Sequence, residues 1–326
     1  MNRYPFDLIR PEVPGPLQDP TVLAQRPFTT VDRSFASEAR LFIPGEELAV
    51  AINTALAVGE PLLITGEPGT GKTQAAYYAA FKLGLEPLIH FQVKSDSTAG
   101  ELLYHFDSVR YFHDAHAGQL SLITPGGDPV AVKKKYVEKR ALWLALERAQ
   151  EKNLPAVLLI DEIDKAPRDF PNDLLLELDK MEFTVRETGE LISAPRILRP
   201  ILFITSNSER RLPEPFLRRC VYHHIVFDDQ IVEKAVAGRR TEFTALSDEV
   251  VKLAMERFLA LRDRTLRKRP ATGEFLVWLR VLAAAVGTTP QRLEECLKRE
   301  DLAILPYLGV LLKDRRDLEE VQASKT

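Results

Sequence analysis

An eight-residue stretch at positions 66–73, GEPGTGKT, constrains the fold of this chain more than any other feature. It matches the pattern G-x-x-x-x-G-K-[ST] in full, and it lies between an apolar run at 61–65 and a helical pattern at 73–83. A strand that turns through glycines into a helix directs several main-chain N–H groups at one point, where the helix terminus adds partial positive charge. The sequence therefore predicts a phosphate-binding loop in an α/β sheet.

Each residue type in this loop has a role in holding a nucleotide. The glycines let the backbone curl around phosphate oxygens, Lys72 is expected to reach the β- and γ-phosphates of ATP, and the hydroxyl of Thr73 is expected to hold Mg²⁺. The alternative is an ordinary glycine-rich turn between a strand and a helix. The predicted nucleotide-binding residues of the loop are Gly66, Glu67, Pro68, Gly69, Thr70, Gly71, Lys72 and Thr73.

A second motif places carboxylates at the end of the apolar run at 156–160. The end of such a strand lies beside the phosphate loop in this kind of sheet, so Asp161 is predicted to bind the hydration shell of Mg²⁺. Glu162 is placed to polarise the attacking water as a general base. The alternative is that Asp161 or Asp164 caps the segment that follows.

Two further polar features follow the apolar run at 201–205. Asn207 can hold the nucleophilic water or a γ-phosphate oxygen, although an Asn-Ser pair also favours a turn. Arg218 or Arg219 would neutralise transition-state charge if it reached into a neighbouring subunit's site. The alternative is a basic pair on the surface of a short helix, and the sequence does not decide which arginine would point at phosphate.

Short apolar runs alternate with helical patterns up to about residue 228, which predicts an α/β fold with a parallel sheet covered on both faces. After residue 228 the strand signal stops. The chain is predicted to contain a Pro-rich arm at 1–38, a nucleotide-binding domain at 39–228 and a helical domain at 229–326. Strands are expected at 61–65, 87–93, 156–160, 201–205 and 221–227, a hairpin at 183–194, and helices at 46–58, 73–83, 137–150, 172–181, 229–237, 248–262, 273–286, 290–299 and 302–313.

The composition narrows the class of protein further. The formal net charge of the 326 residues is −3, which gives no reason to expect binding to nucleic acid or to a membrane. The two cysteines, Cys220 and Cys296, are typical of reduced thiols. No apolar run reaches the roughly 18 residues that span a bilayer, and the N-terminus lacks the apolar region of a signal peptide. We expect a cytoplasmic protein.

Four motifs, GEPGTGKT, LLIDEID, ITSNSE and PEPFLRRC, in this order and spacing resemble those of AAA+ ATPases, and among these the MoxR group. The resemblance runs from about residue 42 to 227. It implies a three-layer αβα P-loop core with Walker A and Walker B motifs and a C-terminal helical lid. It also implies that Asn207 is sensor 1, that Arg218 or Arg219 is the arginine finger, and that the subunits form a hexameric ring with ATP sites between them.

The lid departs from a clean match. A sensor 2 arginine often stands at the start of a lid helix in AAA+ proteins, and here Arg267, Lys268 and Arg269 precede the expected helix at 273–286. We favour Arg269 as the nucleotide-binding residue, with Lys268 next. The alternative for each is a solvated basic residue favoured by the helix dipole.

The resemblance implies a chaperone-like ATPase whose hydrolysis cycle matures or activates a protein client, often together with a partner that carries a von Willebrand A-domain. Residues 94–116 correspond to a region that faces the pore of AAA+ rings, where they would touch substrate, or else they pack in the ordinary way. One alternative is a nucleic-acid motor or loader subunit of the restriction-type translocase kind. Another is a non-hydrolysing, ATP-gated scaffold, against which the presence of both Glu162 and Asn207 argues.

Overall fold

The computed structural model describes residues 34–116, 129–286 and 290–323. Contacts between Cα atoms divide the chain into two compact units, which we describe separately. The first contains residues 44–67 and the described parts of 71–226, and the second contains residues 68–70 with the described parts of 1–43 and 227–326. Among the described helices, none combines the length and the apolar character needed to cross a membrane.

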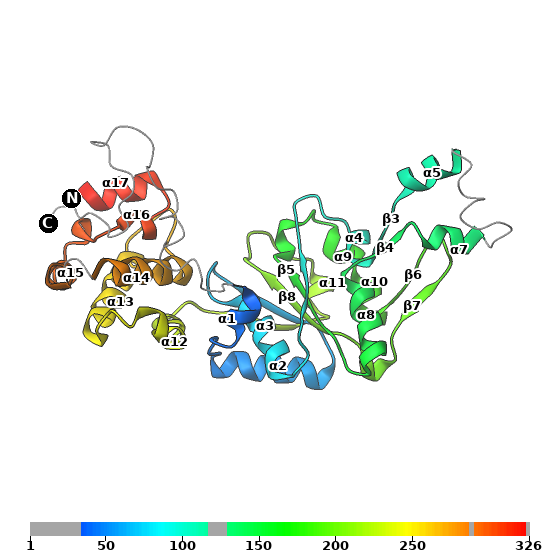
Figure 1. Ribbon diagram of the computed structural model, residues 1–326, viewed down its shortest axis with the longest axis horizontal. Helices are drawn as coiled ribbons and strands as arrows, with labels where there is room; N and C mark the ends of the chain where they lie inside the picture. Colours follow the sequence, from blue (N-terminus) through cyan, green and yellow to red (C-terminus); the bar gives the residue numbers. More distant parts are fainter. Residues whose placement is uncertain (1–33, 117–128, 287–289, 324–326) are drawn as a thin grey trace, which may run out of the picture. The chain divides into compact units, whose positions relative to one another are not determined.

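A five-stranded parallel sheet forms the centre of the first unit (Figure 1). The strands stand in the order β2-β5-β8-β1-β9, so the chain crosses over between non-neighbouring strands. Each predicted strand is present within two residues of the expected bounds. The strands are β1 (Leu62–Gly66), β2 (Ile89–Gln92), β5 (Val157–Asp161), β8 (Ile201–Ser206) and β9 (Val221–Ile225).

Helices cover both faces of this sheet because its central strands are apolar on both sides. On one face, Leu158, Leu202 and neighbouring side chains join a hydrophobic core with α8 (Ala141–Lys152) and α10 (Leu175–Lys180). Side chains at alternate positions point to the other face, where α3 packs against β1, β5 and β8. The elements completing these layers are α2 (Glu46–Val58), α3 (Lys72–Lys82), α9 (Phe170–Asp173) and α11 (Glu214–Leu217). The predicted three-layer αβα fold is confirmed.

Two small antiparallel sheets project from this core. One pairs β3 (Tyr104–Phe106) with β4 (Val137–Lys139). The helix α5 (Ser108–His116) follows β3 in the sequence. The other pairs β6 (Glu182–Thr184) with β7 (Leu191–Ser193), which confirms the predicted hairpin. Short helical elements accompany them: α4 (Gly100–Leu103), α7 (Pro129–Lys134), η2 (Ile163–Lys165) and η3 (Arg196–Leu198).

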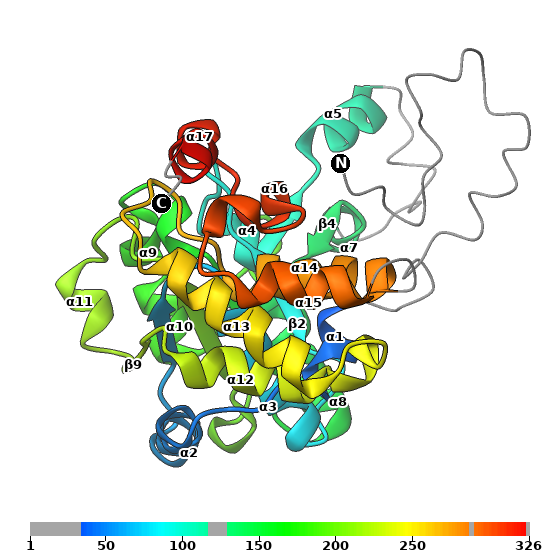
Figure 2. The ribbon, with the colours of Figure 1, turned by 90° about the vertical axis from the view of Figure 1, so that its left-hand side faces the viewer.

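The second unit is helical and has its own hydrophobic core. Phe258 and Phe275 stack with their ring centroids 4.5 Å apart, and Trp278 lies fully buried beside them. Figure 2 shows α13 and α14, which carry these rings, running across the front of this unit. Its described elements are α1 (Phe35–Ala39), α12 (Asp229–Gly238), η4 (Arg240–Phe243), α13 (Asp248–Arg262), α14 (Thr272–Val286), α15 (Pro290–Lys298), η5 (Leu302–Ile304), α16 (Leu308–Leu311) and α17 (Arg315–Ala323).

The segment before α2 packs within the helical unit. Glu38, on α1, pairs with the buried Arg239 at 2.8 Å. A Cβ atom on Gly238 would lie 2.0 Å from the carbonyl oxygen of Leu41, so only glycine fits that close approach. Residues 1–33 of the predicted arm lie outside the described residues. Within the rest of that arm, residues 35–39 form the short helix α1, which is capped by Ser34.

Three predicted helices differ from the structure. The helix expected at 137–150 begins only at Ala141, because the residues before it pair with β3 as strand β4. The helix at 172–181 divides at Leu174 into α9 and α10. The helix at 302–313 divides into η5 and α16, and Pro306, which lacks an N–H donor, lies between the two parts.

Candidate nucleotide-binding site

The predicted phosphate loop connects β1 to α3. Three of its glycines have positive φ values, 149° at Gly66, 79° at Gly69 and 90° at Gly71, and the last two lie in the left-handed region that favours glycine. The ammonium group of Lys72 is buried and donates to the carbonyls of Gly66 and Glu67 at 2.8 Å each. The loop therefore curls around the lysine at the N-terminus of α3.

The predicted metal ligands lie side by side. Thr73 Oγ1 is 3.0 Å from Asp161 Oδ1 and 3.2 Å from Oδ2, although 88 positions separate the two residues. This brings the first turn of α3 to the carboxyl end of β5. Carboxylate and hydroxyl oxygens are hard donors of the kind that Mg²⁺ takes, so this pair fits that metal.

Asp161 is nearly buried, and three polar groups hold its carboxylate. Besides Thr73, the hydroxyl of Thr205 donates to Oδ1, and His90 Nε2 lies 3.2 Å from Oδ2. Burial alone raises the pKa of a carboxyl group, but the hydrogen bonds from His90, Thr205 and Thr73 outweigh it and hold the pKa of Asp161 below its usual value. The site therefore favours a charged carboxylate at Asp161.

A short chain of hydrogen bonds fixes the His90 ring. His90 Nδ1 lies 3.0 Å from the hydroxyl of Tyr77 on α3, and Nε2 faces Asp161. Because an ionised carboxylate only accepts hydrogen bonds, His90 Nε2 donates to Asp161. β2 and α3 thus both orient the carboxylate of β5.

The predicted general base also has several partners. Glu162 Oε2 accepts from Gln92 Nε2 at 2.6 Å and from the ammonium group of Lys165, and Oε1 lies 3.3 Å from Asn207 Nδ2. The backbone of Glu162 has φ 60° and ψ 49°, in the left-handed region that non-glycine residues seldom adopt. Its N–H donates to Thr205 Oγ1 at 2.9 Å, which helps to keep this conformation.

The Asn207 loop is tied to the turn after β5 by Asp164. The Asp164 side chain is buried and accepts from the N–H groups of Asn207, at 3.2 Å, and Glu209, at 2.9 Å. Asp164 therefore anchors the loop after β8 beside Glu162. The alternative that Asp161 or Asp164 caps the segment that follows is wrong, because no side chain caps η2 and the acceptors of Asp164 serve the loop after β8.

The two candidate arginines after α11 differ in their surroundings. Arg219 Nε donates to Asp179 Oδ2 at 2.7 Å, and its Nη1 donates to the carbonyl of Pro215 at 2.8 Å. Arg218 is exposed, and within the described part of the chain its guanidinium has no hydrogen bond or ion pair. The structure thus holds one arginine in a defined orientation and leaves the other in solvent.

The three sensor 2 candidates, Arg267, Lys268 and Arg269, are exposed and belong to the helical unit. The main-chain N–H groups of Arg267 and Lys268 both donate to the buried carboxylate of Asp317, at 2.9 Å each. This fixes the backbone of the segment before α14. Among the described residues, no hydrogen bond or ion pair involves the Arg269 side chain, so its assignment as the nucleotide contact stays a prediction.

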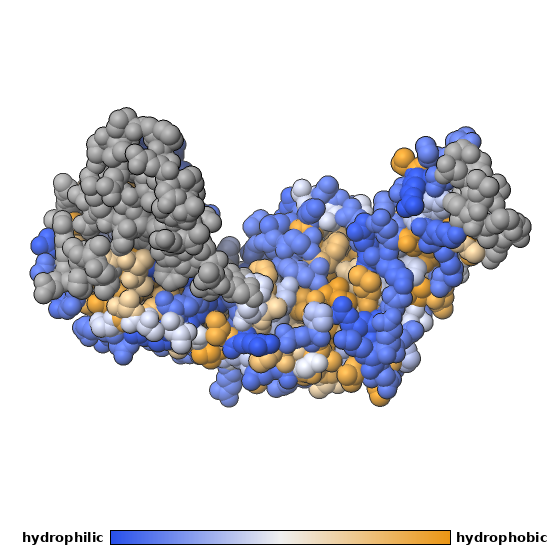
Figure 3. All heavy atoms as spheres, in the orientation of Figure 1, coloured by the Kyte–Doolittle hydropathy of each residue, from blue (hydrophilic) through white to orange (hydrophobic). Residues whose placement is uncertain are grey.

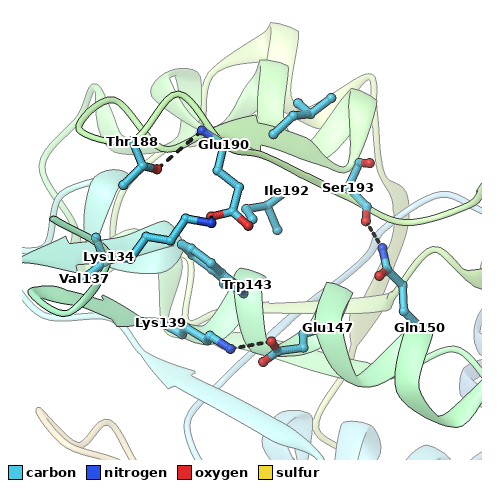
Figure 4. A pocket seen from close by; sticks show the side chains of 11 residues that line it. Lys134, Val137, Lys139, Trp143, Glu147, Gln150, Thr188, Glu190, Ile192 and Ser193 are labelled. Atoms are coloured by element: carbon cyan, nitrogen blue, oxygen red, sulfur yellow. Dashed lines mark hydrogen bonds and ion pairs between the residues drawn. The ribbon is translucent and has the colours of Figure 1, made fainter. Parts of the chain in front are cut away.

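A separate cavity of about 420 Å³ lies between β4, α8 and the β6–β7 hairpin and shares no residue with the site above. Figure 4 shows Trp143 between two ion pairs, Lys134–Glu190 at 2.9 Å and Lys139–Glu147. On the face of this unit seen in Figure 3, hydrophobic residues are scattered among hydrophilic ones. Exposed apolar residues of this kind are ordinary on protein surfaces.

Sequence reasoning missed four residues that contact the carboxylates of Asp161 and Glu162. They come from β2, β8 and the turn after β5, and they are His90, Gln92, Thr205 and Lys165. One signal was available for two of them. His90 and Gln92 are polar residues at alternate positions of an apolar strand, so they share the face opposite to Ile89 and Phe91.

Residues 61–220 match the family described as AAA domain (dynein-related subfamily). The match covers the phosphate loop, the acidic strand end, the Asn207 loop and both arginines. Together with the parallel sheet, its flanking helices and the helical C-terminal region, the match supports a three-layer αβα fold of the AAA+ P-loop kind.

Two solved structures are among those similar to this chain. One is a protein from Cytophaga hutchinsonii ATCC 33406, assigned provisionally as an ATPase; it is 14% identical, with 90% of this chain and 93% of that chain covered and a TM-score of 0.39. The other is NtrX from Brucella abortus in complex with ADP, 14% identical over 88% of this chain and 62% of that chain, with a TM-score of 0.49. No curated protein is similar enough in sequence to count as a relative.

Proposed function

We propose that this chain binds ATP with Mg²⁺ and hydrolyses it to ADP and phosphate. The observation that carries the proposal is the convergence of Thr73, Asp161, Glu162 and Asn207 at the carboxyl ends of neighbouring strands. Separate segments of the sequence bring there a hydroxyl, two carboxylates and an amide. A site that only bound nucleotide would not need a carboxylate and an amide placed to hold water.

The residues divide the work as follows. The loop N–H groups and Lys72 bind phosphate, and Thr73 with Asp161 would hold Mg²⁺, which neutralises phosphate charge when it is bound. His90 and Thr205 keep the Asp161 carboxylate oriented for that role. Glu162 polarises the attacking water, and Asn207, 3.3 Å from it, orients that water.

Burial lowers the pKa of Lys72, while the surrounding carboxylates, with Asp161 first among them, raise it and offset part of that effect. A bound triphosphate would add further negative charge and favour the ammonium form. On binding, Lys72 would exchange its carbonyl partners for phosphate oxygens.

We propose further that ATP is bound between subunits of a ring, most simply a hexamer, and that Arg218 or Arg219 of the neighbouring subunit completes the site. The match to an AAA domain supports assembly, since such domains typically form rings. An arginine supplied in this way stabilises transition-state charge. Arg269 is the proposed nucleotide contact from the helical lid.

The proposed biological role is MoxR-like remodelling of a protein client, with a von Willebrand A-domain protein as a possible partner class. The helix α5 supports a contact with a client, because none of its residues is buried and Val109 and Phe112 are 80% and 59% exposed. Exposed apolar residues on one short helix suit the capture of a polypeptide. The net charge of −3 gives no support for the alternative of a nucleic-acid motor.

Steady-state ATP turnover of the purified full chain, measured with and without Mg²⁺ and with and without duplex DNA, tests the proposal. We expect Mg²⁺-dependent turnover that duplex DNA does not stimulate and that Lys72→Ala abolishes together with ATP binding. Tight ATP binding without turnover would instead support the scaffold alternative, and strong stimulation by DNA would support the motor.

A further inference from the structure

Two arginines converge on the C-terminal end of α10. Arg219, after α11, donates from Nε to the side chain of Asp179 at 2.7 Å. Arg199, just before β8, donates to the main-chain carbonyls of Asp179 and Lys180, at 3.3 and 3.0 Å. Asp179 is therefore held through its backbone by one arginine and presents its carboxylate to the other.

These bonds orient the Arg219 guanidinium. A carboxylate on Nε and a carbonyl on Nη1 fix the plane of the group, and Nη2 makes no hydrogen bond to the described residues. The Arg219 side chain is 42% exposed, so its free donors face solvent. The Arg218 side chain has no comparable support. An arginine that is oriented in advance loses less conformational freedom when it binds phosphate.

Asp179 and Arg219 border a cavity of about 290 Å³ whose apolar lining includes Leu178, Met181 and Phe216. Phe216, in α11, is almost fully buried, so the short helix that ends just before Arg219 is anchored. Arg219 thus projects from a fixed helix end, and Asp179 decides which way its guanidinium faces.

We infer that Asp179 is a positioning residue for catalysis: it orients Arg219 as the arginine that completes the ATP site of the neighbouring subunit. This inference rests on the proposed ATPase and ring. The Asp179–Arg219 pair is about two-fifths exposed, and such pairs contribute little to folding stability. The main effect of losing Asp179 therefore falls on the rate of hydrolysis in the adjacent subunit.

The first test compares steady-state kinetics. We expect Asp179→Ala to lower kcat roughly 10- to 100-fold, the cost of a misplaced catalytic group, and to leave the KM for ATP unchanged. Asp179→Asn keeps an oxygen that can accept from Arg219 Nε, so it should recover part of the rate. The matched control is Glu147→Ala, which removes one partner of another half-exposed ion pair, with Lys139, and should keep the wild-type rate.

Mixed rings give the sharper test. Subunits with Arg219→Ala keep their own site but lack the arginine, and subunits with Glu162→Gln keep the arginine but lack the base. Each type alone should be nearly inactive, and a mixture should regain turnover where one supplies what the other lacks. Adding Asp179→Ala to the Glu162→Gln subunits should abolish this recovery, whereas adding it to the Arg219→Ala subunits should change nothing.

Three outcomes overturn the inference: no recovery in the mixture, recovery that survives Asp179→Ala in the Glu162→Gln subunits, or equal loss from Asp179→Ala in either subunit. The last would mark Asp179 as a general structural residue. The proposed ATPase is judged separately by wild-type turnover, so its failure is distinguishable from the failure of this inference.

Discussion

The buried carboxylate of Asp164 accepts a hydrogen bond from the main-chain N–H of Asn207 at 3.2 Å. This bond ties two segments together. The turn after β5 carries Glu162, and the loop after β8 carries Asn207. The side chains of Glu162 and Asn207 lie 3.3 Å apart as a result. The distance between the proposed base and the proposed water-orienting amide thus depends on a residue that touches neither water nor phosphate.

Replacing Asp164 should therefore lower both the free energy of unfolding and the rate of hydrolysis. Asp164→Ala leaves the N–H groups of Asn207 and Glu209 without their acceptor, and a lost partner of this kind costs roughly 1–3 kcal/mol. We expect a lower free energy of unfolding in urea and a fall in kcat. Asp164→Asn keeps one acceptor oxygen and should lose less of both. Equal stability of wild type and Asp164→Ala would contradict this role.

Thr205 links the two carboxylates of the acidic strand end. Its hydroxyl donates to Asp161 and accepts from the N–H of Glu162, and the side chain is fully buried. Thr205→Val has the same shape but lacks the hydroxyl, so we expect a loss of roughly 1–3 kcal/mol in unfolding free energy and slower turnover. Thr205→Ser should keep the turnover rate, since it keeps the hydroxyl. Retention of wild-type turnover by the valine variant would exclude this linking role.

The lowered pKa of Asp161 predicts how stability depends on pH. Its hydrogen bonds favour the charged form in the folded state, so between the folded pKa and the ordinary aspartate pKa of 3.8 the unfolded chain binds more protons. The contribution is present above about pH 4 and is lost as the pH falls through the folded pKa. The unfolding free energy of wild type minus that of Asp161→Asn should therefore be larger at pH 5 than at pH 3.

The matched control for that series is Asp173→Asn, at an exposed carboxyl group on α9. This variant removes one carboxylate charge outside the site, so it reports the effect of the charge change itself. A difference for Asp161→Asn that grows as the pH falls would contradict the sign worked out above.

Gly238 tests the packing of residues 34–43 within the helical unit. A methyl group there would meet the carbonyl of Leu41 at 2.0 Å, so Gly238→Ala should destabilise by about 1–3 kcal/mol through a forced backbone shift. Gly273, in α14, has open space around its would-be Cβ. Gly273→Ala should therefore be neutral or stabilising in the same thermal unfolding assay. Equal midpoints for the two variants would count against the close approach at Leu41.

The sheet could be predicted from the sequence because its strands are short, apolar and separated by strong helical or turn signals. The runs at 61–65 and 156–160 both became buried strands within one residue. The segment from β3 to β4, which contains α5, could not be predicted in this way. Its strands β3 and β4 have three residues each, which is too short for an alternating pattern to stand out in the sequence.

In the candidate site, too, some residues could be predicted from the sequence and others could not. Lys72, Asp161 and Asn207 could be located because each belongs to a motif at the end of a strand. The side chains that support them could not, because their positions depend on the pairing of strands far apart in sequence. His90 reaches Asp161 only because β2 pairs with β5 in a register that sets His90 opposite Leu159.

The substitution Glu162→Gln tests most directly whether Glu162 acts in hydrolysis while the phosphate loop binds ATP. Glutamine keeps the size of the side chain but cannot take a proton from water, so turnover should fall roughly 10²- to 10⁴-fold. ATP binding, followed by titration calorimetry with Mg²⁺, should stay at the wild-type affinity because Lys72 and Thr73 are untouched. Hydrolysis at the wild-type rate by Glu162→Gln would show that Glu162 is not the general base and would overturn the account.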